Sequence, residues 1–212
     1  MKRFTVFISL TLFFIASFSQ SLKPVSPTQQ KAMITQIMNV ESTIKTIQCN
    51  FIQIKRLSML NDKMVSHGRM IYQKPSSLHW EYQSPYSYIF IINGAKVLIK
   101  QGGKKNSIDI KSSRMFQEIT RIMMNSVTGK DLMSSSEFNV KMYTQYNDWV
   151  ADLIPKRHQM KSMFSTIRIY FDSNKSIVSK IEMFEKGGDK TEIELRNVQI
   201  NAHINEKLFN LD

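Results

Sequence analysis

Alternation of apolar and polar residues with a period of two most constrains the fold of this chain, because it recurs over most of its length. Such alternation is typical of strands that bury one face of a sheet. Hairpin signals such as Asn93-Gly94 separate the runs, without helical crossovers, so neighbouring strands are expected to pair antiparallel. The predicted strands are 48–59, 64–73, 78–83, 88–93, 95–100, a short strand ending at 110, 137–144, 148–154, 164–172, 176–185 and 191–198.

Two segments replace this alternation with the spacing of an amphipathic helix. The first covers residues 29–46, with Thr28 as its predicted N-cap. The second covers residues 113–127, and Thr128-Gly129 is expected to end it, with glycine just beyond the last turn. Each helix has an apolar face that must be buried, and the concave side or mouth of the sheet is the obvious place.

The order of elements is helix, about five strands, helix, about five strands, with no internal domain boundary. A length of 212 residues and a hydrophobic content of 42% suit a single packed core. We therefore predict a mainly β chain with helices, of the α+β class. Its antiparallel sheet of about 10–11 strands is strongly curved into an incomplete barrel, with an α-helical lid over an apolar cavity.

The first 19 residues have the layout of a secretory signal peptide. Lys2 and Arg3 form a basic start, residues 4–14 are apolar, and Ser17 and Ser19 provide small residues before a cleavage point. Such a segment is removed during export. In a Gram-negative cell the mature protein is then expected in the periplasm.

Cleavage after residue 19 defines the rest of the predicted organisation. Residues 20–27 form a proline-containing linker, and residues 28–212 form one domain. The formal net charge falls from +12 to +10, because only Lys2 and Arg3 are lost. A basic protein of this kind can meet an acidic protein surface or an anionic membrane. Nucleic acid is not expected as a partner, because the basic residues are spread singly and the protein is exported.

Motifs of enzymes and metal sites are missing from the sequence. No pair of its four histidines has the spacing of metal ligands, and it contains no G-x-S-x-G motif. Gly129-Lys130-Asp131 lacks the residues of a phosphate-binding loop, and Cys49 is interpreted as a small packing residue. We predict no catalytic residue, no metal and no cofactor, although scattered Asp and Glu leave a carboxylate pair possible.

Aromatic residues of the first strands and the apolar faces of both helices would together enclose a cavity. Methionine, which occurs 14 times, is flexible and suits a surface that accepts varied apolar ligands. The period of two does not decide which sheet face is inward, because a shift of one residue exchanges the faces. The predicted lining residues are Ile34, Ile37, Met38, Phe51, Met70, Tyr72, Leu78, Trp80, Tyr82, Phe90, Phe116, Ile119 and Met123.

A series of motifs between residues 51 and 94 points to a known family. It consists of Phe51-Ile52-Gln53, the run GRMIYQKP at 68–75, LHWEY at 78–82, Ser84-Pro85 and Asn93-Gly94. This series resembles that of the LolA-type outer-membrane lipoprotein carriers. The segment 197–209 resembles the closing part of Bacteroidetes-like members, so the resemblance extends over essentially the whole mature chain.

The resemblance implies a carrier whose cavity takes the acyl chains of lipoproteins. An inner-membrane ABC transporter would release the lipoprotein to it, and an outer-membrane acceptor, where one exists, would receive the cargo. We expect a monomer that is not an enzyme. Three alternatives stay open. They are a periplasmic binding protein for another lipid or amphiphile in the same barrel, an enzyme that modifies envelope lipid or glycan, and a scaffolding or adhesin-type surface module, which would need a filled core and an exposed flat patch.

One position departs from the family pattern. The family typically has arginine before the proline that ends the GRMIYQKP run, and this arginine is thought to hold the lid closed. This chain has Lys74 before Pro75 instead. Lysine lacks the planar fork of donors that arginine offers. Our hypothesis is that Lys74 still acts as the lid latch by donating to backbone carbonyls of residues 127–132.

Overall fold

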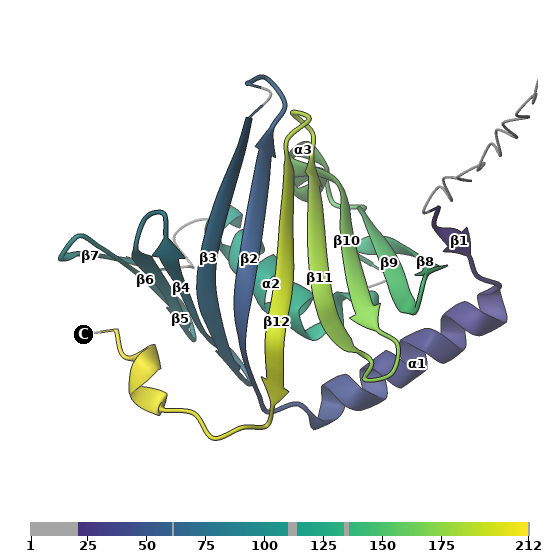
Figure 1. Ribbon diagram of the computed structural model, residues 1–212, viewed down its shortest axis with the longest axis horizontal. Coiled ribbons are helices and arrows are strands. Elements are labelled where there is room, and N and C mark those ends of the chain that lie inside the picture. Colours follow the sequence, from purple (N-terminus) through teal and green to yellow (C-terminus); the bar gives the residue numbers. More distant parts are fainter. Residues whose placement is uncertain (1–20, 61, 110–113, 134–135, 212) are drawn as a thin grey trace, which may run out of the picture.

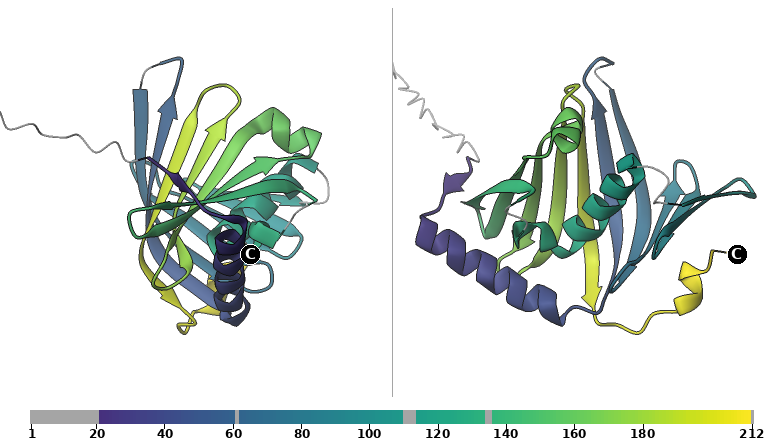
Figure 2. Two further views of the ribbon diagram at one scale, coloured as in Figure 1. Left: turned by 90° about the vertical axis from the view of Figure 1, so that its right-hand side faces the viewer. Right: turned by 180° about the vertical axis from the view of Figure 1, so that it is seen from behind.

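The computed structural model describes residues 21–60, 62–109, 114–133 and 136–211, without the side chains of residues 114–119, 131 and 133. The predicted signal peptide lies outside these residues. In the described part of the chain, twelve strands form one open antiparallel sheet, which curves around helix α2 (Figures 1 and 2). The predicted fold class is thereby confirmed, with one strand more than expected.

The strand order in the sheet is β1-β8-β9-β10-β11-β12-β2-β3-β4-β5-β6-β7. The strands are β1 (Lys23–Pro24), β2 (Thr46–Leu57), β3 (Asp62–Gln73), β4 (Ser77–Ser84), β5 (Tyr88–Asn93), β6 (Lys96–Gln101), β7 (Lys104–Asp109), β8 (Phe138–Gln145), β9 (Asp148–Pro155), β10 (Phe164–Asp172), β11 (Ile177–Glu185) and β12 (Lys190–Ile200). The unexpected strand is β1, which lies inside the predicted linker. Its two residues pair with Thr144 and Tyr143 of β8.

The helices are α1 (Pro27–Thr43), α2 (Arg114–Thr128) and α3 (His158–Met163), with short 3-10 helices η2 (Lys130–Met133) and η3 (Glu206–Phe209). The predicted spacing identified α1 and α2. It missed α3 and η3, which are too short to show a helical period. Gly129 has a φ of 78°, so the glycine after α2 adopts the left-handed conformation expected of it.

Helix α1 begins two residues earlier than predicted. Ser26 is its N-cap, and the side chains of Ser26 and Gln29 each accept a hydrogen bond from the backbone N–H of the other. Pro27 occupies the first helical position, where its missing N–H costs nothing. Thr28 therefore lies inside the helix, and the prediction of this residue as the N-cap is wrong.

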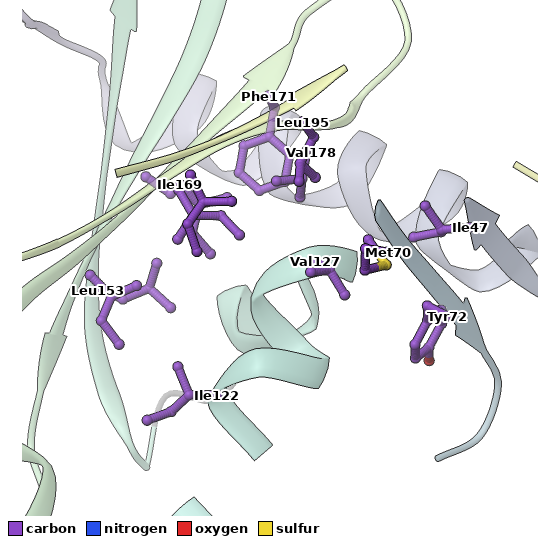
Figure 3. Packing of buried hydrophobic residues seen from close by; sticks show 14 of the residues in the cluster. Ile47, Met70, Tyr72, Ile122, Val127, Leu153, Ile169, Phe171, Val178 and Leu195 are labelled. Carbon is purple, nitrogen blue, oxygen red and sulfur yellow. The ribbon is translucent and has the colours of Figure 1, made fainter. Parts of the chain in front are cut away.

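The main core lies on the concave face, where every strand from β2 to β12 contributes apolar side chains. Figure 3 shows Ile122 and Val127 of α2 between Leu153 and Ile169 on one side and Met70 on the other. Helix α1 lies along one end of the sheet and α2 crosses its concave face (Figure 2). The apolar faces of the two helices are thus covered by the same sheet from two directions.

A smaller layer covers the convex face at β4 and β5. The C-terminal helix η3 packs there, with Phe209 buried and the backbone carbonyl of Leu208 2.9 Å from Nδ1 of His79. The Asn93 side-chain amide donates to the carbonyl of Phe209 at 3.2 Å. The chain end is thereby fixed on the opposite face of the sheet from helix α2.

Candidate functional site

A cavity of about 240 Å³ lies between helix α2 and the concave face of the sheet. Isoleucine, methionine and aromatic side chains form most of its wall. Because β10 begins and β11 ends here, the cavity lies toward the end of the sheet that carries α3 and the β2–β3 turn (Figure 1). The lining residues are Gln53, Trp80, Tyr82, Ile122, Met123, Met163, Phe164, Met183, Glu185 and Ile193.

An aromatic cluster forms the floor of the cavity. The ring centroids of Phe51 and Trp80 lie 4.4 Å apart, and those of Phe51 and Tyr82 lie 5.2 Å apart in an edge-to-face arrangement. Gly68 allows this packing, because a Cβ at residue 68 would collide with the Phe51 ring and the carbonyl oxygen of Glu81. The glycine of the GRMIYQKP motif therefore brings strands β2, β3 and β4 into close contact below the cavity.

Few polar groups reach the cavity wall. The Tyr82 hydroxyl donates to Oε1 of Gln53 at 2.8 Å, and burial raises the pKa of Tyr82 above its usual value, so the hydroxyl remains a neutral donor. Glu185 is 3.3 Å from Nζ of Lys55, which balances its charge at the rim. The wall is thus apolar with a small polar corner, a composition that suits an aliphatic ligand with one polar end.

The C-terminal end of α2 is held firmly at the far side of the cavity. A Cβ at residue 129 would meet the ring of Phe171 at 2.7 Å and the side chain of Ile37 at 3.5 Å, so α2 ends in direct contact with β10 and α1. Val127 and Thr128 are buried there. Any movement of α2 that opens the cavity is therefore expected to pivot about residues 127–129.

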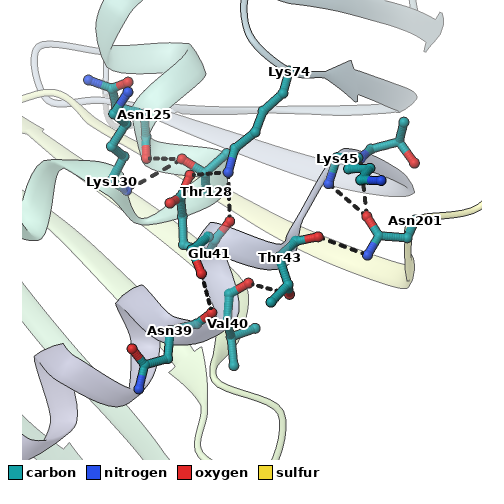
Figure 4. A network of polar contacts seen from close by, with 12 residues as sticks. Asn39, Val40, Glu41, Thr43, Lys45, Lys74, Asn125, Thr128, Lys130 and Asn201 are labelled. Atoms are coloured by element: carbon teal, nitrogen blue, oxygen red, sulfur yellow. Dashed lines mark hydrogen bonds and ion pairs between the residues drawn. The ribbon is translucent and has the colours of Figure 1, made fainter.

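Lys74 lies beside this pivot, but its partner differs from the one we predicted. Its ammonium group donates to the backbone carbonyl of Glu41 at 2.8 Å and lies 3.0 Å from the Glu41 carboxylate (Figure 4). The hypothesis of hydrogen bonds to carbonyls of residues 127–132 is therefore corrected: Lys74 contacts the last turn of α1. The reason is that α1 reaches across the end of the sheet and places a buried carboxylate next to residue 74.

Three of the predicted lining residues, Trp80, Tyr82 and Met123, line the cavity itself. Phe51, Met70, Tyr72, Leu78 and Ile37 are buried in the core around it. Phe90 is half-buried against that core, and Met38 is half-buried on α1. Ile34 lines a separate groove along the outer side of α1. The side chains of Phe116 and Ile119 lie outside the described residues.

The sequence analysis missed the part of the wall formed by later strands. Met163 and Phe164 come from the α3–β10 junction, and Met183 and Ile193 come from β11 and β12. Alternation places Met183 on the same face as the buried Ile181, and Ile193 on the same face as the buried Leu195. It does not place Met163, which ends α3, or Phe164, which precedes a register shift in β10. Only the antiparallel order β10-β11-β12-β2 shows which of these inward residues lie opposite Gln53 and Trp80.

Comparison with known proteins identifies the family. The family model for the outer membrane lipoprotein carrier protein LolA matches residues 42–212. The chain belongs to this family. The resemblance found in the motifs from Phe51 to Gly94 is thereby confirmed, and the family match extends from the end of α1 through η3.

Relatives within the LolA family are distant but match over most of their length. The outer-membrane lipoprotein carrier protein of Pseudomonas aeruginosa strain PAO1 is 22% identical over 181 residues, covering 85% of this chain and 84% of that protein. That of Legionella pneumophila strain Paris is 23% identical over 168 residues, covering 79% of each chain. That of Coxiella burnetii is 22% identical over 209 residues, covering 95% of this chain and 92% of that protein.

Solved structures with a similar backbone include a LolA superfamily protein from Nitrosomonas europaea and the lipoprotein LppX from Mycobacterium tuberculosis. The first has a TM-score of 0.44 and 6% identity, covering 85% of this chain and 97% of that chain. The second has a TM-score of 0.49 and 8% identity, covering 85% of this chain and 99% of that chain.

Across the described residues, each helix is too short or too polar to cross a bilayer.

Proposed function

We propose that this LolA-family protein is a periplasmic carrier that binds the acyl chains of lipoproteins in the cavity under α2 and moves them from the inner to the outer membrane. The observation that carries the proposal is the apolar cavity of about 240 Å³ between α2 and the concave sheet. Its family and its relatives, named as lipoprotein carriers, support the same cargo. Catalysis is not part of this role.

Transfer of an acyl chain between a membrane and a protein requires that the bilayer and the protein cavity both offer the chain an apolar environment. Each buried methylene is worth about 0.8 kcal/mol, so an apolar cavity can compete with a bilayer for part of a chain. Met123, Met163 and Met183 give the wall flexible side chains that adapt to chains of different shape. The polar corner at Tyr82 and Gln53 provides groups for the polar end of the cargo.

The route of the cargo belongs to the same proposal. The N-terminal signal peptide at residues 1–19 would direct the chain to the periplasm, where the mature protein works as a monomer. An inner-membrane ABC transporter would load it, and an outer-membrane acceptor would receive the lipoprotein where the cell has one. The protein would then need neither nucleic acid nor a cofactor.

The test is binding of a fluorescent fatty acid to the protein purified from the periplasm, together with native mass spectrometry for a co-purified acylated protein. The double variant Met123→Gln/Met183→Gln places amides in the cavity wall and should weaken binding about tenfold. Met38→Gln, a half-buried methionine on α1 outside the cavity wall, is the matched control. Equal affinity of all three proteins would place the ligand elsewhere and overturn the proposal.

The same mass spectra distinguish the carrier from two of the alternatives, the binding protein for another lipid and the enzyme. A free lipid or amphiphile in place of an acylated protein would favour a binding protein for that molecule. A truncated or transferred lipid or glycan after incubation with envelope material would favour an enzyme. A co-purified acylated protein supports the carrier.

A further inference from the structure

We propose that the turn between β2 and β3 is a membrane-contact site, through which the open end of the sheet docks on an anionic bilayer. The site consists of Met59 and Leu60 at the turn and Met64 and Val65 at the start of β3. This proposal names a partner for the carrier function and rests on it, but it concerns a surface that the cavity does not include.

The observation behind the proposal is a concentration of exposed apolar side chains. Met59 is 94% exposed and Leu60 is 69% exposed, and both Met64 and Val65 are also exposed. Among the described residues, seven large apolar side chains are exposed, and four of them belong to this one hairpin. A turn between strands normally carries small or polar residues, so an apolar tip has no role in forming the hairpin.

The tip is held in place by its neighbour. The Ser58 hydroxyl donates to the carbonyl of Gly187 at 3.1 Å, and the Ser58 backbone N–H donates to Oδ1 of Asp189 at 2.9 Å. These bonds join the β2–β3 turn to the β11–β12 turn, and both project from the sheet beyond the other strands (Figure 1). Met59 and Leu60 therefore lie on one hairpin whose position is fixed by its neighbour.

Charges around the tip favour an anionic surface. Arg56, Lys63 and Lys186 are exposed at the two turns. Asp62 is exposed there too, whereas the carboxylates of Glu185 and Asp189 lie 3.3 Å and 3.9 Å from Nζ of Lys55. Each basic residue near an anionic bilayer adds to the attraction, within the range set by salt. Apolar tips with a basic surround are the combination that binds membrane interfaces.

The cavity lies close to the proposed membrane-contact site. Met183 and Glu185 of its wall are in the last three residues of β11, immediately before the turn that Ser58 contacts. Phe164, at the start of β10, pairs with Glu185. A protein resting on a bilayer through Met59 and Leu60 would therefore have the near end of its cavity facing the membrane.

The experiment is co-sedimentation of the periplasm-purified protein with vesicles of phosphatidylethanolamine and phosphatidylglycerol, compared with phosphatidylcholine vesicles. The mass of the protein is measured first, so that a retained N-terminal segment is not mistaken for the site. The parent should bind the anionic vesicles more tightly, and Met59→Gln/Leu60→Gln should reduce this binding about tenfold or more. Tyr146→Asn is the control, because Tyr146 is 75% exposed in the β8–β9 turn at the opposite end of the sheet.

A second pair of variants tests the charges. Lys63→Glu/Lys186→Glu should weaken binding to anionic vesicles and make it less sensitive to salt, whereas Lys175→Glu, in the β10–β11 turn at the opposite end, should leave it unchanged. Absence of vesicle binding by the parent, or equal binding by the Met59/Leu60 variant, would overturn the proposal and point to a protein partner. Fatty-acid binding, measured on the same samples, reports the carrier function separately and checks that each variant is folded.

Discussion

At the end of the sheet where β3 turns into β4, helix α1 lies against the strands, and Ile37, Phe171 and Gly129 pack together with no exposed apolar side chain among them. At the opposite end, the β2–β3 turn leaves Met59 and Leu60 in solvent, and the cavity lies close by. We call these the closed end and the open end. The difference shows that one continuous sheet can be densely packed at one end and leave a cavity and an apolar turn at the other.

The largest effect is expected from a cavity created at the closed end. Ile37 is fully buried, so Ile37→Ala should lower the free energy of unfolding by about 3 kcal/mol. Met163→Ala, at the half-buried wall of the open end, should cost about 1 kcal/mol, because the site already borders a cavity. Urea unfolding of both variants measures the comparison. Equal losses would mean that the two ends contribute alike to stability.

The ion pair at the closed end ranks next. Lys74→Leu would leave the buried Glu41 carboxylate without its partner and should cost about 2 kcal/mol, since Lys74 itself is one-third exposed. If Lys74 restrains the movement of α2 about residues 127–129, the variant should also release a bound fluorescent fatty acid faster. Lys45→Leu, an exposed neighbour, is the control for added apolar surface. Unchanged release would remove Lys74 from the opening of the cavity.

A charged cluster on the convex face between the two ends should control the response to acid. Burial alone would raise the pKa of Glu182. The hydrogen bond from Lys190 and the charges of Lys180 and Lys190 lower it by more than burial raises it, so the pKa of Glu182 is below its usual value. Its stabilising effect is therefore complete above the unfolded pKa, about 4.3, and is lost as the pH falls through the folded value. Glu182→Gln should flatten the fall in stability below about pH 5. If the variant loses stability below about pH 5 as steeply as the parent does, other carboxylates cause the loss.

The N-cap of α1 should have a smaller effect. Ser26→Ala removes one half of the capping box and should cost about 1 kcal/mol, whereas Thr28→Ala should stay within about 0.5 kcal/mol. Thermal unfolding of the two variants compares the observed cap with the one predicted from sequence. A larger loss for Thr28→Ala would contradict the cap geometry.

The smallest effect is expected at the open end. Ser58→Ala removes exposed hydrogen bonds to Gly187 and Asp189 and should cost no more than about 0.5 kcal/mol overall. Amide exchange in the two linked turns should nevertheless become faster, because the local contacts hold the tip. Unchanged exchange there would mean that strand pairing alone fixes the tip.

Local patterns in the sequence predict the strands well, because alternation and turn residues act over a few positions. The spans 88–93 and 164–172 are reproduced without error, and the turn at Asn93-Gly94 forms as expected. Helix α3 was missed because six residues, four of them polar or basic, show no period. The two-residue strand β1 carries no alternation and exists only through its pairing with β8.

The cavity was harder to predict, because its wall depends on contacts between distant segments. Alternation marks Phe51, Met70 and Leu78 as residues of one sheet face, and all three are buried. It does not show that this face is the inner one, or that α2 and neighbouring side chains fill the space beside them. Similarly, no local signal connects Lys74 with Glu41, since the contact depends on where α1 crosses the end of the sheet. The family resemblance predicted an apolar cavity, and the sheet order decides which residues line the cavity observed here.

The pairing of β12 with β2 affects how the chain assembles. Leu195 lies opposite Phe51, and Ile200 lies opposite Ile47, so the middle of the sheet joins the last long strand to the first. During synthesis, β2 to β7 emerge as local hairpins that form early, while the junction must wait until residue 200 has appeared. Until then the inner edge of β2 has no neighbour, and the aromatic cluster under it stays open to other chains. Synthesis of β12 is therefore the step that joins two separate sets of hairpins into one sheet with an enclosed core.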